Sequence, residues 1–237
     1  MMSEQLAFDL PLRPALGREN FFVSPSNALA LAIVDGWENW PSGKLVLVGP
    51  DGAGKTHLAR MWADEHDAVI VKARDLPGAV IDALAACRFV VVEDADLLCD
   101  PDCGFSAQAA QDALFHLHNL TLAEGGCLLL TASSPPSRWP LTLPDLRSRM
   151  EATTVAQLES PDDTLLTAML LKLFSDRQLA VTPGLISYIV RRMTRSHAAA
   201  CDLVAALDAL ALAQGKPVSQ TMAASLFESD MATDAPM

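Results

Sequence analysis

The sequence has few aromatic residues, few basic residues and no long uninterrupted apolar segment. Seventeen lysines and arginines stand against 29 aspartates and glutamates, which gives a formal net charge of −12. A surface of this sign repels phosphate backbones and argues against autonomous nonspecific DNA binding. The four tryptophans are expected to pack in the interior rather than to stack on bases. No apolar run approaches the ~20 residues that a membrane-spanning helix requires, so no membrane association is expected.

Cysteines are few, and their spacing matches no common disulfide or metal-binding motif. The chain has five cysteines, an odd number, and none stands in a Cys-x-x-Cys pair. The start of the chain has neither the basic nor the apolar region of a secretory signal. Cys99 and Cys103 are four residues apart, but no second ligand pair lies at zinc-finger spacing. These features predict a reducing, cytoplasmic compartment and no structural metal site.

Apolar residues are plentiful, at 51% of the chain, with a mean hydropathy of +0.24. This composition excludes a globally disordered or collagen-like chain. A length of 237 residues allows one large domain, or one domain with a smaller companion.

Four short apolar runs alternate with segments of helical periodicity in the first two thirds of the chain. The runs cover residues 45–48, 68–71, 89–94 and 127–134, and the main intervening helices are predicted at 26–40, 56–66, 76–86 and 106–124. Buried strands that alternate with helices predict an α/β fold, a parallel sheet with helices on both faces.

Beyond residue 157 the apolar positions follow helical spacing only. Four helices are predicted, at 162–177, 183–192, 197–214 and 219–227, which together form a small all-α domain. The predicted organisation is therefore an extended arm at 1–20, a nucleotide-binding domain at 21–157, the helical domain at 158–228 and a disordered tail at 229–237.

The segment GPDGAGKT, residues 49–56, follows the first strand and begins a helix. It matches the phosphate-binding loop pattern G-x-x-x-x-G-K-[ST] in the required context. Gly49, Gly52 and Gly54 allow backbone N–H groups to turn towards phosphate, and Lys55 and Thr56 supply an ammonium group and a hydroxyl for Mg²⁺. We expect ADP or ATP to bind here; the alternative is a tight strand-to-helix turn without a ligand.

Polar side chains end the third and fourth strands. Glu93 and Asp94 follow the run FVVV, and Thr131, Ser133 and Ser134 follow CLLL. The carboxyl ends of parallel strands share one edge of a sheet with the phosphate loop. One carboxylate, Glu93, is expected to hold Mg²⁺ with Thr56, and its neighbour Asp94 to polarise a water molecule. Thr131 is expected near the terminal phosphate. The alternative for the acidic pair is two solvated carboxylates.

The segments GPDGAGKTHLARMW, VVVEDADLL, LLLTASSPPSRWP and LPDLRSRM, with FVSPSNALA ahead of the loop, resemble the AAA+ domain of the DnaA/Hda family of bacterial replication proteins. The resemblance covers about residues 20–228 and is weaker in the helical part. It implies a P-loop AAA+ sheet with a helical lid domain. Because neither an N-terminal interaction domain nor a basic DNA-binding domain fits the sequence, the resemblance is to the short, Hda-like members of the family.

The arm contains QLAFDL, residues 5–10, which is similar to motifs by which proteins dock on the bacterial DNA polymerase sliding clamp. Leu6, Phe8 and Leu10 supply apolar anchors and Gln5 a directional amide, as in other extended peptide ligands. The alternative is an apolar arm that folds back over the nucleotide-binding domain.

The resemblance also assigns an arginine that reaches into the nucleotide site of a neighbouring AAA+ subunit. By position this is Arg149, with Arg147 as the second candidate; the alternative is a surface arginine paired with Asp145 or Glu151. At the place of the family's lid sensor arginine this chain has Cys201. Arg191, Arg192 and Arg195 are the available substitutes, and weak or absent hydrolysis in the chain's own site is expected.

These features predict a regulator that docks on the sliding clamp (β subunit), contacts DNA only through it, and promotes hydrolysis of DnaA-bound ATP to prevent re-initiation of replication. The alternatives are a clamp adaptor without hydrolysis-stimulating activity and a small-molecule phosphotransferase. The working nucleotide, ADP or ATP, and self-association stay open.

Overall fold

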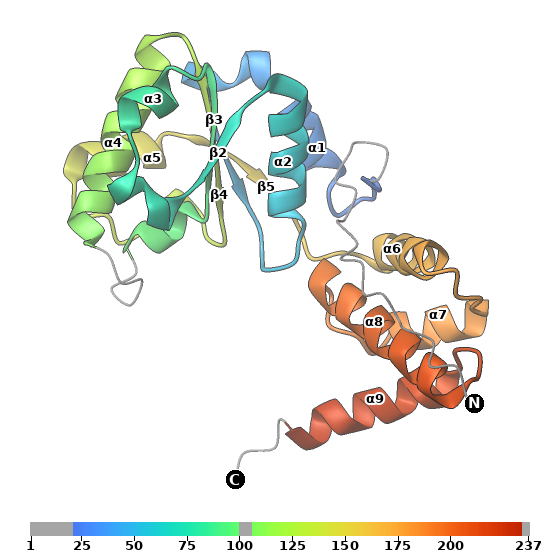
Figure 1. Ribbon diagram of the computed structural model, residues 1–237. Coiled ribbons are helices and arrows are strands. Elements are labelled where there is room, and N and C mark those ends of the chain that lie inside the picture. Colours follow the sequence, from blue (N-terminus) through green and yellow to red (C-terminus); the bar gives the residue numbers. More distant parts are fainter. Residues whose placement is uncertain (1–20, 100–105, 234–237) are drawn as a thin grey trace, which may run out of the picture.

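A computed structural model describes residues 21–99 and 106–233 (Figure 1). The clamp-like motif with Gln5, Leu6, Phe8 and Leu10 lies outside these residues. The first part of the described chain is a five-stranded parallel sheet in the order β2-β3-β4-β1-β5. Its strands are β1 (Lys44–Val48), β2 (Val69–Lys72), β3 (Phe89–Glu93), β4 (Cys127–Ala132) and β5 (Thr154–Gln157).

The sheet lies between two layers of helices (Figure 1). One layer holds α1 (Ala28–Asp35) and α2 (Lys55–His66). The opposite layer holds α3 (Ile81–Ala85), α4 (Ala107–Ala123) and α5 (Pro144–Glu151). The central strands β1 and β4 are buried along their whole length, because apolar side chains on both faces enter one or the other of the two cores. This confirms the predicted α/β fold with helices on both faces.

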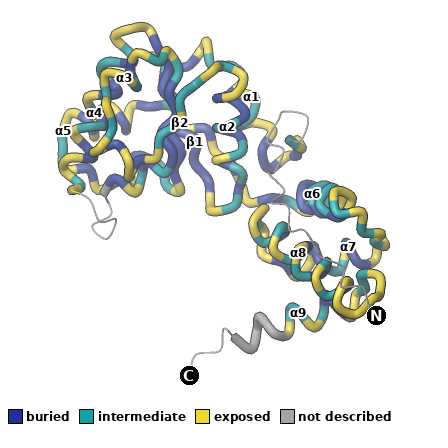
Figure 2. Tube along the Cα trace, in the orientation of Figure 1, coloured by how far each residue is buried: buried dark blue, intermediate teal, exposed yellow. Residues whose placement is uncertain are grey.

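A third, separate core holds the C-terminal helices together. It includes Leu170, Phe174, Ile189 and Val204. The helices are α6 (Asp163–Asp176), α7 (Pro183–Val190), α8 (His197–Gln214) and α9 (Gln220–Thr233). Figure 2 shows the buried residues gathered separately in the sheet and in this helical bundle, which we call the lid. In the described part of the chain, α8 is long and apolar enough to span a membrane, but it packs in the lid core, and one such helix is weak evidence.

Helix boundaries in the lid follow side-chain caps. Asp162, Thr182 and Ser196 stand at the N-caps of α6, α7 and α8, and each side-chain oxygen accepts the backbone N–H three residues later. Gly215 ends α8 in a left-handed conformation with φ of 61°. These are the residue types that satisfy exposed helix ends, and they explain why the predicted bounds of α6, α7 and α8 agree with the observed ones to within two residues.

Three expectations need correction. The helix predicted at 76–86 is instead a 3₁₀ segment, Ala73–Gly78, followed by the short α3, because Pro77 and Gly78 interrupt the pattern. Helix α5 and strand β5 were not expected. Helix α9 continues to Thr233, into the stretch 229–237 that was predicted as a tail, and the rest of that stretch lies outside the described residues.

Candidate functional site

The phosphate-loop sequence lies between β1 and α2, at the carboxyl edge of the sheet. Gly52 and Gly54 have positive φ angles of 75° and 99°. Such angles are unfavourable for residues with a Cβ atom, so both glycines are required by the path of the loop. Gly54 is the residue that precedes the first turn of α2. The backbone N–H groups of this helix start and the positive end of its dipole point towards the loop, an arrangement that suits a bound phosphate.

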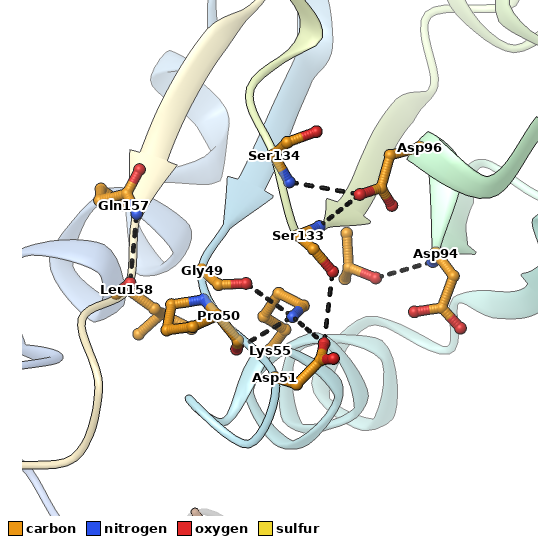
Figure 3. Close-up of polar contacts among 11 residues, drawn as sticks. Gly49, Pro50, Asp51, Lys55, Asp94, Asp96, Ser133, Ser134, Gln157 and Leu158 are labelled. Carbon is orange, nitrogen blue, oxygen red and sulfur yellow. Dashed lines mark hydrogen bonds and ion pairs between the residues drawn. The ribbon is translucent and has the colours of Figure 1, made fainter. Parts of the chain in front are cut away.

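Lys55 is buried in the first turn of α2 and reaches back across the loop. Its Nζ donates to the carbonyl oxygens of Gly49, at 2.7 Å, and Pro50, at 3.1 Å. It also lies 3.5 Å from the carboxylate of Asp51 (Figure 3). The ammonium group is therefore held inside the curve of the loop, where it is placed to neutralise phosphate oxygens. Thr56, the next residue, is exposed.

The two carboxylates at the end of β3 differ in environment. Glu93 is 3% exposed, and its Oε1 lies 3.8 Å from Nε of Arg60 on α2. That separation is too long for a hydrogen bond, and the oxygen has no hydrogen-bond partner among the described residues. Asp94 is partly exposed and has a positive φ of 58°, so the chain turns sharply after the strand. Of the two carboxylates, that of Glu93 is therefore buried, and that of Asp94 is partly exposed at the end of the strand.

The ends of β3 and β4 are joined by hydrogen bonds (Figure 3). The buried hydroxyl of Thr131 accepts the backbone N–H of Asp94 at 3.0 Å, and Asp96 accepts the N–H groups of Ser133 and Ser134 at 2.9 and 3.3 Å. Thr131 thus fixes the turn that carries Asp94. Its expected contact with a terminal phosphate stays a prediction.

The chemistry of this edge fits Mg²⁺. Glu93 presents a buried carboxylate oxygen without a hydrogen bond, and Thr56 presents an exposed hydroxyl at the start of α2. Hard oxygen ligands of this kind suit Mg²⁺ bound together with nucleotide phosphates. The loop itself carries the carboxylate of Asp51, and Glu93, Asp94 and Asp96 lie at or just after the end of β3, at the same edge of the sheet. A divalent cation would offset their repulsion of a polyphosphate.

The lid contacts the phosphate loop at Gly52. A Cβ atom built on Gly52 would lie 2.1 Å from Cβ of Ser196, the N-cap of α8. The first turn of α8 is therefore packed against the loop, and only glycine allows this approach.

We expect Gly52→Ala to lower the free energy of unfolding by about 1–2 kcal/mol from backbone strain alone, with a further loss because the lid must move away. The matched control is Gly125→Ala. Gly125 has a similar φ of 70°, but a Cβ atom there meets nothing within 4 Å. Denaturant unfolding of both variants measures the difference. Equal losses would show that the contact between loop and lid contributes nothing.

The arginines that could replace the lid sensor arginine are held within the lid or at its start. Arg195 donates to the Pro161 carbonyl at 3.1 Å and pairs with Asp163 at 2.5 Å. Arg191 and Arg192 bond back to carbonyl oxygens of their own helix, α7. Cys201 lies with its Sγ 3.6 Å from Nδ1 of His197, and burial raises the pKa of its thiol. In the described residues, none of these contacts joins a lid guanidinium to the phosphate loop.

Arg149 lies at the opposite edge of the sheet from the phosphate loop. It stands in the last turn of α5, and its carbonyl oxygen accepts a hydrogen bond from Lys44, the first residue of β1. The phosphate loop follows Val48, the last residue of β1, so the length of this strand, ~13 Å at 3.3 Å per residue, separates the two. The chain's own nucleotide edge is thus out of reach of its own Arg149.

The Arg149 side chain is exposed and rests on α4. Its Nη1 donates to Oδ1 of Asn119 at 2.5 Å, and its Cζ lies 5.1 Å from the centre of the Phe115 ring. Among the described residues it makes no ion pair with Asp145 or Glu151, the alternative partners. Arg147, the second candidate, instead turns back and donates to the carbonyl oxygen of Leu141 through Nε and Nη2.

Asp51, Arg60 and Asp96 contact residues of the candidate site, Lys55, Glu93 and Ser133, although the sequence did not single them out. The third acidic residue of the run EDAD was the available signal for Asp96. Arg60 follows Thr56 by four positions, one helical turn, and this spacing places both on one face of α2. Nothing in the sequence indicated the contact of Asp51 with Ser133, which joins residues 82 positions apart.

No family model matches the chain. The chromosomal replication initiator protein DnaA of Caulobacter vibrioides is 30% identical over 224 residues, which cover 85% of this chain and 45% of that protein. Domain III of DnaA from Thermotoga maritima superposes with a TM-score of 0.75 at 20% identity, over 93% of this chain and 98% of that chain. AMPPCP-bound DnaA from Aquifex aeolicus gives a TM-score of 0.67 at 18% identity, over 82% and 65%.

These similarities establish the fold as that of an AAA+ ATPase domain. The chain spans about half the length of the curated relatives that it matches.

Proposed function

We propose that this chain is a regulator within the DnaA/Hda family of AAA+ proteins, a placement that its similarity to DnaA supports. The proposed activity is the promotion of ATP hydrolysis in the nucleotide site of a DnaA partner, which would prevent re-initiation of replication. The proposed partners are DnaA and the sliding clamp, with DNA reached only through the clamp. The proposed location is the cytoplasm.

The observation that carries the proposal is the position of Arg149. Its exposed guanidinium lies at the edge of the sheet opposite the chain's own phosphate loop. A planar and permanently charged group in this position is suited to a phosphate held by another molecule. Charge that develops on the γ-phosphate of DnaA-bound ATP would be stabilised by Arg149 from across the interface.

The chain's own nucleotide would have a structural role. The loop at 49–56, with Lys55, Thr56, Glu93 and Asp94, is proposed to hold ADP or ATP with Mg²⁺. The lid packs against this loop through Ser196 and Gly52, so a bound nucleotide would stabilise one arrangement of lid and sheet. Because the arginines of the lid bond elsewhere, we expect the isolated protein to hydrolyse ATP slowly or not at all.

The test is the turnover of DnaA-bound ATP in the presence of DNA-loaded clamp, with and without this protein. We expect hydrolysis that depends on both the protein and the clamp. Binding to DnaA without any change in its nucleotide would instead indicate an adaptor.

The clamp motif gives a separate prediction. We expect a Gln5→Ala, Leu6→Ala double variant to bind the clamp ~700-fold more weakly, since anchor residues of this type contribute about 2 kcal/mol each. Stimulated hydrolysis should fall with it, while nucleotide affinity stays unchanged. A Ser3→Ala, Glu4→Ala variant changes the arm outside the motif and is the matched control. Clamp pull-down measures binding, and retention of the double variant would contradict the assignment.

A further inference from the structure

Two buried polar side chains, those of Lys44 and His118, lie next to Arg149. Lys44, at the start of β1, is 7% exposed, and His118, on α4, is 3% exposed. Nζ of Lys44 lies 3.3 Å from Nε2 of His118 and donates to the Arg149 carbonyl oxygen at 2.8 Å. A lysine buried among strands is costly unless its N–H groups are bonded, so its retention here calls for a reason.

The ring nitrogens of His118 contact three groups: Nε2 lies 3.3 Å from Nζ of Lys44, and Nδ1 lies 3.3 Å from Oδ1 of Asn119 and 3.5 Å from Nη1 of Arg149. Burial, the positive charge of Lys44 and, to a smaller extent, that of Arg149 lower the pKa of His118 to about 4, against a hydrogen bond with Asn119 that raises it. Neutral His118 that accepts from Lys44 at Nε2 carries its hydrogen on Nδ1. That nitrogen lies 3.3 Å from Oδ1 of Asn119, which also accepts from Nη1 of Arg149.

The hydrogen bonds thus form a closed path that begins at the Arg149 carbonyl oxygen and ends at the Arg149 guanidinium. Lys44 holds the backbone of Arg149, and His118 orients the amide that receives its guanidinium. The Arg149 carbonyl belongs to the last turn of α5, where no later residue of the helix satisfies it. Lys44 and the hydroxyl of Thr153, at 2.8 Å, together bind this oxygen.

We propose that Lys44 and His118 form a buried support that fixes the last turn of α5 and thereby directs the Arg149 side chain towards the nucleotide of the partner. This inference rests on the proposed function, since it concerns the same reaction. Both are positioning residues: they contact Arg149 or its neighbour, not the reacting phosphate. Holding a long side chain in its working direction before the partner arrives removes an ordering cost from the interaction.

Two variants test the support. Lys44→Met keeps an unbranched side chain without a charge, and Lys44→Met with His118→Leu replaces the whole polar pair by apolar groups. Replacing a whole buried polar pair by apolar groups is often neutral or stabilising, whereas removing one partner destabilises the fold. The double variant should therefore show an unchanged or higher thermal unfolding midpoint, and Lys44→Met alone a lower one. The maximal stimulated rate of DnaA-bound ATP hydrolysis should fall ~10-fold or more, with less than a threefold change in the concentration of protein needed for half-maximal stimulation.

A merely structural role would not give the double variant this combination of retained stability, retained affinity and lost rate. Lys72→Met, which removes an exposed lysine from β2 of the same sheet, is the matched control and should leave the rate unchanged. In an Arg149→Ala background the Lys44→Met exchange should cause no additional loss, because its effect passes through Arg149.

The outcomes separate the two proposals. Wild-type stimulation by folded Lys44→Met and by the folded double variant, with Arg149→Ala inactive, would overturn the support and leave the proposed function intact. Wild-type stimulation by Arg149→Ala itself would overturn the proposed function. If one of the two Lys44 variants fails to fold, the stimulated rate of the folded variant is used for the test. A further loss of stimulated rate when Lys44→Met is added to Arg149→Ala would also contradict the support.

Discussion

Arg149→Ala is expected to lower the stimulated hydrolysis of DnaA-bound ATP by ~10³-fold or more, the lower end of the effect of arginines that act across an interface. The loss should appear in the maximal rate, because the guanidinium stabilises charge that exists only in the transition state. Stability should change little, since the Arg149 side chain is exposed. Single-turnover hydrolysis with DNA-loaded clamp measures the effect.

The matched control for Arg149→Ala is Arg147→Ala, two positions earlier on the same helix. The Arg147 guanidinium donates through both Nε and Nη2 to a backbone carbonyl, that of Leu141, whereas Arg149 donates through Nη1 to a side chain, that of Asn119. Removal of Arg147 should therefore leave most of the stimulation in place. If Arg147→Ala were the inactive variant and Arg149→Ala the active one, the roles of the two arginines would have to be exchanged.

Lys55→Ala is expected to weaken binding of ADP and ATP by about 100-fold, which corresponds to the loss of one or two charge-assisted hydrogen bonds to phosphate. The Lys55 ammonium lies inside the loop and is bonded to Gly49 and Pro50, so its position is fixed before a nucleotide arrives. Titration with a fluorescent ADP analogue measures the affinity, and Lys72→Ala serves as the control. Unchanged affinity would mean that this loop is a strand-to-helix turn and not a phosphate site.

The central strands and the phosphate loop were predictable because their signals are local. A strand buried on both faces, such as β1 or β4, is an unbroken apolar run, and the loop after β1 has its glycines and lysine at fixed spacing. Strand β5 has no such run: Val155 is exposed and Ala156 is buried in a strand of four residues. Helix α5 begins with a proline and has few apolar positions, so its existence depends on packing against α4 and the loop before it.

The predicted site residues are placed in two separate regions. Lys55, Thr56, Glu93, Asp94 and Thr131 come together at one edge of the sheet, and Arg149 stands at the other. Sequence spacing indicated which residues end strands, since that depends on neighbours along the chain. It gave no sign of the contacts of Lys44 and His118 with Arg149, because hydrogen bonds between distant elements have no local pattern.

The placement of Arg149 and the phosphate loop at opposite ends of β1 makes the proposed contact directional. When such molecules meet through it, one end of the pair still presents an unused arginine and the other an unused nucleotide site. Contacts of this polarity do not close on themselves around a twofold axis, and they build rows or rings. A regulator of this form would therefore contact a DnaA molecule through its Arg149 end, while its own phosphate-loop end stays available to an arginine of a further molecule.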